Sequence, residues 1–93
     1  MNVFFTEAAR ADIASIYEYI SRDNPLAARR VVAAIESATD RLTPFPFSGR
    51  IGGVEGTREV IVTGLPYIVV YRVTADAVEI IAVFHAKQDR PRG

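Results

Sequence analysis

The sequence lacks cysteine altogether and contains only one lysine and one histidine among its 93 residues. The absence of cysteine excludes disulfide bonds and metal sites built on thiolates. Eleven basic residues balance eleven acidic ones, so the chain also lacks the basic excess that is usual in dedicated nucleic-acid-binding proteins. A function that depends on many phosphate contacts is therefore disfavoured, and direct sequence-specific binding to nucleic acid is not expected.

A long hydrophobic run is also missing from the N-terminal part of the chain. Polar and charged residues interrupt this part at Asn2, Thr6, Glu7, Arg10 and Asp12. The sequence therefore predicts neither a signal peptide nor a membrane span, and the expected location is the cytoplasm. With 93 residues, 49% of them hydrophobic, the chain is expected to form one domain, residues 1–93, around one core.

The first half of the chain carries the pattern of a short strand followed by two helices. After a strand-like run over residues 1–5, Thr6 can cap a helix by accepting one of its free backbone N–H groups. Helical spacing relates Ala9, Ile13, Ile16 and Ile20 in the first helix, and Ala28, Val31, Ile35, Ala38 and Leu42 in the second. Asn24-Pro25 separates them, because asparagine caps well and proline fits the first helical position. The short connection predicts an antiparallel helical hairpin.

The second half changes from helical to strand periodicity. Prolines at 44 and 46 and several glycines between 49 and 56 predict a loop or an irregular strand. Strands are predicted over residues 57–63, 67–73 and 78–85, joined by turns short enough to make neighbours antiparallel. In the last strand, Val78, Ile80, Ala82 and Phe84 are expected to point one way, and Glu79, Ile81, Val83 and His85 the other.

This order of elements predicts an α+β fold. We expect an N-terminal strand and a two-helix antiparallel hairpin packed on a small, mainly antiparallel sheet that three C-terminal strands complete.

Seven short segments, in order along nearly the whole chain, resemble the RelE/ParE superfamily of bacterial toxins. They are 9–13 (ARADI), 19–20 (YI), 24–28 (NPLAA), 46–50 (PFSGR), 56–59 (GTRE), 66–72 (PYIVVYR) and 85–89 (HAKQD). The resemblance implies the toxic half of a type II toxin–antitoxin pair. It further implies a hetero-oligomer with a ParD-like or RelB-like antitoxin, and no metal, nucleotide or other cofactor.

The target divides this superfamily into two branches. RelE-type members cut messenger RNA on the ribosome, whereas ParE-type members poison DNA gyrase and are not known as nucleases. The Asn24-Pro25 connection, the Gly49-Arg50 loop and the His85-x-x-x-Asp89 ending are more similar to the ParE branch. The resemblance therefore implies DNA gyrase as the target and favours a function other than catalysis.

An mRNA endonuclease is the alternative from the enzyme class. Cleavage through the 2′-hydroxyl needs a base, a cation for the phosphorane and an acid for the leaving oxygen. A resemblance to RelE-type toxins implies that several Lys and Arg side chains and a C-terminal Tyr or His carry out this cleavage. Here Lys87 is the sole lysine, and no tyrosine follows Tyr71. The residues left for catalysis are Arg58, Arg72, His85 and Lys87. A third hypothesis is a detoxified homologue, because Ala86-Lys87-Gln88 departs from the Gly or Arg frequent in the family.

Two surfaces are predicted to bind partners. Contacts with the target are assigned to Arg50, Arg58, Arg72, His85, Lys87 and Arg90. Arg58 and Arg72 could form a basic site on an open sheet face; alternatively they pair with Glu59, Glu79 or Asp76 across strands. His85 is either an acid–base residue or a hydrogen-bonded structural one. Tyr67 and Tyr71 are expected on the same face of their strand. There they form either a platform on which bases stack or part of the packing under the helices.

The antitoxin surface is predicted from the second helix, whose apolar residues cover more than one stripe. One stripe is enough to cover a sheet, so the surplus predicts an exposed apolar strip. An antitoxin could dock there as a helix in a groove or as an added edge strand. The residues assigned to this surface are Ile16, Tyr19, Ile20, Val31, Val32 and Ile35. The competing interpretation is a preference for alanine as a good helix former.

Overall fold

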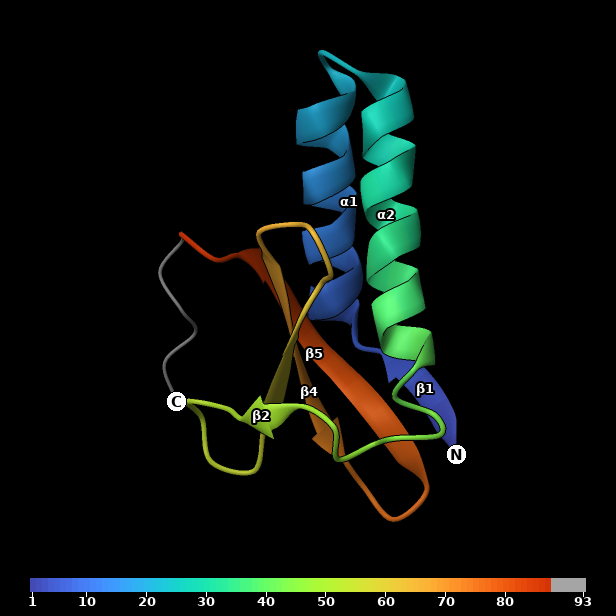
Figure 1. Ribbon diagram of the computed structural model, residues 1–93, viewed down its shortest axis with the longest axis vertical. Coiled ribbons are helices and arrows are strands. Elements are labelled where there is room, and N and C mark those ends of the chain that lie inside the picture. The colour runs from blue at the N-terminus through green and yellow to red at the C-terminus, as the bar shows by residue number, and fades with distance from the viewer. Residues whose placement is uncertain (88–93) are drawn as a thin grey trace.

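The computed structural model describes residues 1–87 and consists of two helices and a five-stranded sheet (Figure 1). The elements are β1 (Asn2–Phe5), α1 (Glu7–Ser21), α2 (Pro25–Asp40), β2 (Arg50–Ile51), β3 (Arg58–Ile61), β4 (Tyr67–Val73) and β5 (Ala77–His85). The predicted α+β class and order of elements are confirmed. The assignment of Arg90 to the target surface lies outside the described residues.

Both helices begin at the predicted caps. The hydroxyl of Thr6 accepts the N–H of Ala9 at 3.1 Å, and the side-chain oxygen of Asn24 accepts the N–H of Ala27 at 3.0 Å. Each bond satisfies a backbone donor that the first helical turn cannot satisfy internally. α1 and α2 then run side by side as an antiparallel hairpin (Figure 1).

The sheet has the strand order β1-β5-β4-β3-β2. The pairs β5–β4, β4–β3 and β3–β2 are antiparallel, whereas β1 pairs with β5 in parallel. The sequence predicted a mainly antiparallel sheet but not this parallel pair. The first and last strands of the chain are thus neighbours in the sheet, with β1 at its edge beside β5.

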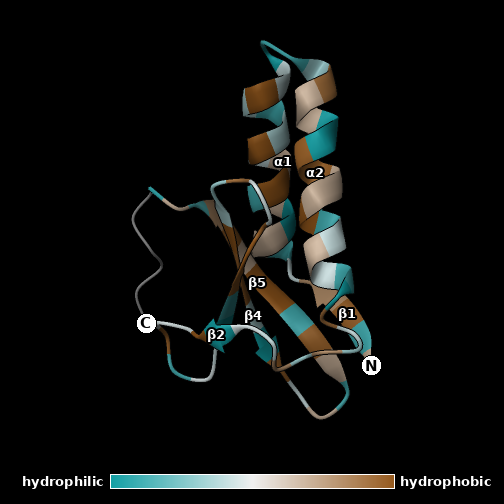
Figure 2. Ribbon diagram, viewed as in Figure 1, coloured by the Kyte–Doolittle hydropathy of each residue, from teal (hydrophilic) through white to brown (hydrophobic). Residues whose placement is uncertain are grey.

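The main core lies between the helical hairpin and one face of the sheet. Its fully buried members include Ile35 and Leu42 from the α2 side and Tyr71, Val78 and Ile80 from the strands. β5 is hydrophobic along most of its length in Figure 2. A second, smaller cluster on the other face of the sheet contains Ile68, Val70 and Phe84.

A bulge interrupts the pairing of β4 with β5. Val70 faces Ala82 and Tyr71 faces Ile80, so Ile81 is an extra residue that no residue of β4 opposes. The side-chain alternation predicted along β5 was therefore wrong beyond Ile80: Val83 joins the core under the helices, and Phe84 points to the other face. The apolar pattern could not reveal this, because all residues around the bulge are hydrophobic.

Because β1 is short, the last part of β5 lies at an edge of the sheet. Two polar side chains bond to its free backbone groups there. β1 ends at Phe5, beyond which the hydroxyl of Thr6 donates to the carbonyl of Ile81 at 3.3 Å. The N–H of Val83 donates to Oδ2 of Asp12 at 3.0 Å. Asp12 thereby ties α1 to the sheet and satisfies an edge donor.

Replacement of Asp12 by alanine is expected to reduce the free energy of unfolding by about 1–2 kcal/mol. The N–H of Val83 would lose its acceptor in a partly buried position, and leaving such a donor unsatisfied costs about that much. Urea denaturation of Asp12→Ala measures the effect, with Asp23→Ala as the control because Asp23 is exposed in the helical turn. Equal stability of the two variants would contradict this role of Asp12.

Candidate functional site

Arg58 and Arg72 lie on opposite faces of the sheet. Arg58 is paired with Tyr71 in the β3–β4 register, and cross-strand partners point to the same face. Tyr71 is fully buried under the helices, so Arg58 lies on the helix-bearing face. Arg72 follows Tyr71 in β4 and points the other way. Of the two alternatives that the sequence left open for these arginines, one basic site on an open sheet face is therefore wrong, because the register places them on different faces.

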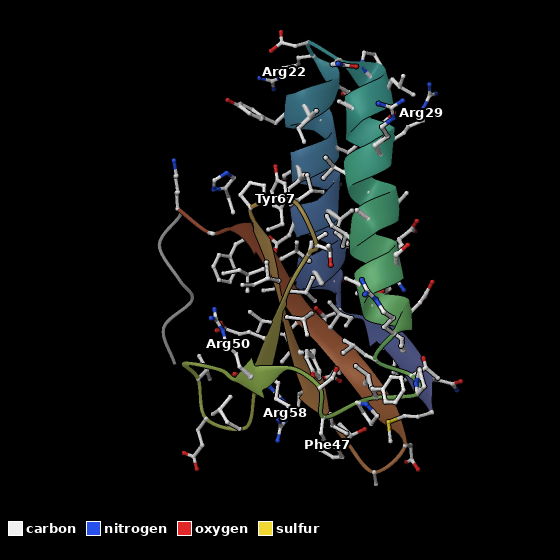
Figure 3. All side chains as sticks on the ribbon, viewed as in Figure 1. Arg22, Arg29, Phe47, Arg50, Arg58 and Tyr67 are labelled. Atoms are coloured by element: carbon white, nitrogen blue, oxygen red, sulfur yellow. The ribbon has the colours of Figure 1, made fainter. Side chains whose placement is uncertain are left out.

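The side chain of Arg58 is engaged with the loop that follows α2. Its Nη1 atom donates to the carbonyl oxygens of Phe47 at 3.2 Å and Gly49 at 2.9 Å. The guanidinium also lies over the ring of Phe47, with Cζ 5.1 Å from the ring centroid (Figure 3). Arg58 therefore serves to fix this loop against β3.

Arg50 and Arg72 both form ion pairs on the face away from the helices. Arg50 contacts the carboxylate of Glu59 at 3.1 Å, and Glu59 is only 5% exposed. Arg72 lies 3.9 Å from Glu79, with both side chains well exposed. The second pair confirms the cross-strand interpretation of Arg72, and its contribution to stability is below about 1 kcal/mol because water screens it.

His85 lies on the helix-bearing face, at the opposite end of β4 from Arg58. It faces Tyr67 across the strands, with ring centroids 5.5 Å apart in an edge-to-face arrangement. Nδ1 of His85 accepts the N–H of Lys87 at 3.1 Å, so a neutral ring carries its proton on Nε2. In this tautomer the basic lone pair of His85 is already used by the backbone.

The four residues considered for a nuclease therefore do not converge. Tyr67 and Tyr71, the partners of His85 and Arg58, are four residues apart in β4, which is roughly 13 Å along a strand. Arg72 is on the other face, and the exposed Lys87 follows the end of β5. Arg58 and Arg72 therefore lie too far from His85 to act with it on one phosphate, whereas Lys87 is next to His85.

A groove of about 610 Å³ lies between α1 and the adjoining ends of β4 and β5. It is lined by Ser15, Ile16, Glu18, Tyr19, Arg22, Tyr67 and His85, which we call the α1 groove. Tyr19 projects into solvent and is 73% exposed, while Glu18 and Arg22 form an ion pair of 3.2 Å at its rim. Tyr67 and Arg22 are labelled in Figure 3. The groove thus combines an apolar wall with aromatic and charged side chains, a composition that suits a protein partner.

The α1 groove unites residues that the sequence assigned to different partners. Ile16 and Tyr19 were predicted to contact an antitoxin, and His85 was predicted to contact the target. Tyr67, which sequence reasoning treated mainly as packing, stands between them. Its place opposite His85 depends on the strand register, which the sequence pattern did not fix.

The predicted antitoxin strip on α2 is largely absent as a surface. Val31 is 9% exposed and Ile35 is completely buried, so both belong to the main core. Ile20 is partly buried and packs against that core, and Val32 is also partly buried. The expectation of exposed apolar residues at 31 and 35 was wrong. Because α2 packs against α1 as well as against the sheet, it buries a wider apolar stripe than contact with the sheet alone would need.

The α1 groove raises the pKa of the Tyr67 phenol above its ordinary value of 10.0, through burial and secondarily through the neighbouring Tyr19. Because the folded protein holds this proton more tightly than the unfolded chain, the stabilising contribution is complete below pH 10 and is lost as pH rises through the pKa of the folded state. We expect alkaline destabilisation to be smaller in Tyr67→Phe than in the wild type. Urea denaturation between pH 9 and 11 measures it, and identical pH profiles would contradict the assignment.

Within residues 1–87, no group of three or more His, Asp or Glu side chains is arranged to hold a metal ion. Neither helix of this part of the chain has the length and hydrophobicity needed to span a membrane.

Comparison with known proteins places this chain among the toxins of type II toxin–antitoxin systems. The model of the family described as "ParE toxin of type II toxin-antitoxin system, parDE" matches residues 3–90. The chain therefore belongs to the ParE toxin family, and the resemblance to the RelE/ParE superfamily is confirmed.

Individual relatives carry names from both branches. The chain is 49% identical over 74 residues to the protein Y4kP of Sinorhizobium fredii, which carries a toxin name, covering 80% of this chain and 76% of that protein. It is 36% identical over 84 residues to toxin RelE2 of Caulobacter vibrioides, covering 90% and 93%. A solved chain of the chromosomal ParDE TA (toxin–antitoxin) system from P. aeruginosa has a TM-score of 0.83 and 25% identity, covering 91% and 95%. The toxin function is thus shown. Because the names include both ParE and RelE, they do not distinguish ParE-type from RelE-type action.

Proposed function

We propose that this toxin acts in the bacterial cytoplasm by contact with DNA gyrase and that a ParD-like antitoxin neutralises it. The observation that carries the choice of target is the dispersal of the candidate nuclease residues. Arg58 and Arg72 occupy opposite faces, and His85 lies at the far end of β4 from Arg58. A protein that acts by binding needs a surface, whereas a nuclease needs these groups around one phosphate.

Recruiting these residues for RNA cleavage would also disturb the fold. Arg58 would have to leave two loop carbonyls, and His85 would have to break its bond from Lys87 before Nδ1 could accept a proton. The RelE-type alternative is favoured by the name of the Caulobacter relative and by the likeness to a solved RelBE2 complex from Mycobacterium tuberculosis, with a TM-score of 0.65 and 26% identity. We therefore place RNA cleavage second.

We assign the antitoxin to the α1 groove. An amphipathic helix can lay apolar side chains against Ile16 and the rings of Tyr19 and Tyr67, while its polar side meets the Glu18–Arg22 pair. A bound antitoxin would cover His85 in the same groove. Neutralisation would then follow from direct coverage of a residue that we expect to meet the target.

Expression of the chain in a bacterial host tests the choice of target. We expect growth arrest with induction of a DNA-damage reporter, because a poisoned gyrase leaves broken DNA, and relief on co-expression of the antitoxin from the neighbouring reading frame. Arrest with an early fall in translation and cut messenger RNA would overturn the gyrase assignment. Normal growth together with intact antitoxin binding would support the detoxified homologue instead.

A further inference from the structure

The end of the helical hairpin projects beyond the sheet (Figure 1). The molecule measures 40 Å along its longest axis, and the two helices run along this axis. The turn between them, residues 22–25, is exposed. The first residue of α2 in the main core is Val31, so the residues of α2 before it are not part of that core. The projecting end is therefore available to a partner.

Three exposed side chains near the start of α2 share one face of the helix. Leu26, Arg29 and Arg30 are three and four residues apart, the spacing that makes side chains neighbours on a helix. Leu26 is 50% exposed, and both arginines are exposed as well. We call these three residues the hairpin-end patch. The patch places one apolar side chain beside two guanidinium groups.

The two charges of the hairpin-end patch are not neutralised within the part of the chain that the structure describes. Arg29 and Arg30 form no ion pair within residues 1–87. Their helical neighbours, residues 25–27 and 32–34, carry no charged side chain. The helix dipole favours cations at the C-terminal end of a helix, yet the last turn of α2 contains no basic residue. The position of these arginines therefore does not serve the stability of α2.

The hairpin end is held in one shape before any partner arrives. The side-chain oxygen of Asn24 accepts the N–H of Ala27 at 3.0 Å, and the N–H of Asn24 donates to the carbonyl of Ile20 at 3.0 Å. Pro25 occupies the first position of α2, where its fixed φ suits the helix. A partner that binds this end does not have to order it first, which favours affinity.

The composition of the hairpin-end patch favours a protein surface as its partner over a nucleic acid. Two arginines on a chain of zero net charge can neutralise only a few phosphates, and binding to DNA depends on many such contacts. Leu26 would also find no apolar partner on a sugar–phosphate backbone. A protein pocket that accepts Leu26 and carries carboxylates at its border matches both features, because guanidinium groups bind carboxylates in a bidentate manner.

We propose that the hairpin-end patch docks on DNA gyrase at an apolar pocket bordered by carboxylates. This inference rests on the proposed function and specifies the chemistry of the surface that the target offers. Arg22, which lines the α1 groove, and Arg29 extend to opposite sides of the hairpin end in Figure 3. The patch therefore lies away from the groove that we assign to the antitoxin. The target would contact both surfaces, and the antitoxin only the groove.

Removal of the two charges separates action on the target from binding of the antitoxin. In a supercoiling assay with purified gyrase, we expect Arg29→Gln/Arg30→Gln to need at least about tenfold more toxin than the wild type for half-inhibition. Its affinity for the antitoxin in calorimetric titration should stay within about twofold, which also shows that the variant folds. Leu26→Gln should raise the half-inhibitory concentration about fivefold, because it removes the apolar contact.

Arg10→Gln/Arg41→Gln is the matched control for the double variant. Arg10 and Arg41 are exposed, form no ion pair within residues 1–87 and lie at the other end of the hairpin. This variant loses the same charge, so its inhibition of gyrase should stay within about twofold of the wild type. Equal losses in the two double variants would show an effect of overall charge and would overturn the proposal.

Three other outcomes would also overturn the proposed docking. Wild-type inhibition by Arg29→Gln/Arg30→Gln would do so and would leave the proposed function standing. Lower inhibition with an equal loss of binding to a DNA fragment in the absence of gyrase would identify DNA as the partner of the patch. A wild-type toxin that leaves gyrase fully active would refute the proposed function itself, and this inference with it.

Discussion

Replacement of Tyr19 by aspartate is expected to weaken antitoxin binding about 100-fold. Tyr19 is 73% exposed at the α1 groove, so its ring is available to a partner and contributes little to the core. Exposed aromatic side chains at the centre of an interface often contribute about 2 kcal/mol or more, and a buried carboxylate in their place would add a desolvation cost. Calorimetric titration of the toxin with its antitoxin measures the change directly.

Tyr17→Asp is the matched control for this prediction. Tyr17 lies on the same helix, is 38% exposed and does not line the α1 groove. Two residues along a helix turn the side chain to a different face, so the control should change affinity by less than about threefold. If the two variants lost the same affinity, or if Tyr19→Asp kept wild-type binding, the antitoxin would not occupy this groove.

Replacement of Gly49 by alanine is expected to lower the free energy of unfolding by roughly 2–4 kcal/mol. A Cβ atom at this position would lie 2.6 Å from the hydroxyl of Tyr71 and 2.7 Å from the carbonyl oxygen of Glu59. Relief of this overlap would shift β2 away from β3 or break the bond from Gly49 to the Tyr71 hydroxyl. Urea denaturation monitored by circular dichroism measures the loss.

Two further variants test the physical reason for that loss. Gly53→Ala should change stability by less than about 0.5 kcal/mol, because a Cβ there would meet nothing within 4 Å. Tyr71→Phe removes only the hydroxyl and should cost about 1–2 kcal/mol, less than Gly49→Ala. A Gly49→Ala protein as stable as Gly53→Ala would show that the loop does not depend on this close approach.

The helical hairpin could be predicted because its signals are local. Thr6 and Asn24 cap helices through side chains that act within three residues, and the short turn between the helices leaves an antiparallel hairpin as the compact solution. The strands were found for a similar reason, since alternation and β-branched residues mark β3, β4 and β5. Fold class follows from such elements once their order is known.

Features that depend on long-range register were not predictable. The bulge at Ile81 changes which residues of β5 face the helices, yet the apolar run from Ile80 to Phe84 reads the same with or without it. The separation of Arg58 from Arg72 depends on the pairing of Arg58 with Tyr71, a contact across two strands. The parallel pairing of β1 with β5 joins residues about 75 positions apart, as between Asn2 and Ala77.

The candidate surfaces were partly predictable for the same physical reasons. Ile16 and Tyr19, both assigned to the antitoxin surface from the sequence, line one groove on α1, and their contact with an antitoxin stays a prediction. Val31 and Ile35 were misassigned because hydrophobicity alone does not distinguish packing against a helix from exposure to a partner. Tyr67 gains its importance from the register of β4 with β5, which only the structure reveals.

The central proposal is that the toxin acts by binding gyrase and does not cleave RNA. Supercoiling of relaxed plasmid by purified gyrase, with the toxin added and then titrated with antitoxin, tests this claim most directly. We predict loss of supercoiling with accumulation of cleaved DNA, and recovery when the antitoxin reaches the concentration of the toxin. Undiminished supercoiling, while the same toxin preparation cuts ribosome-bound messenger RNA, would contradict the account.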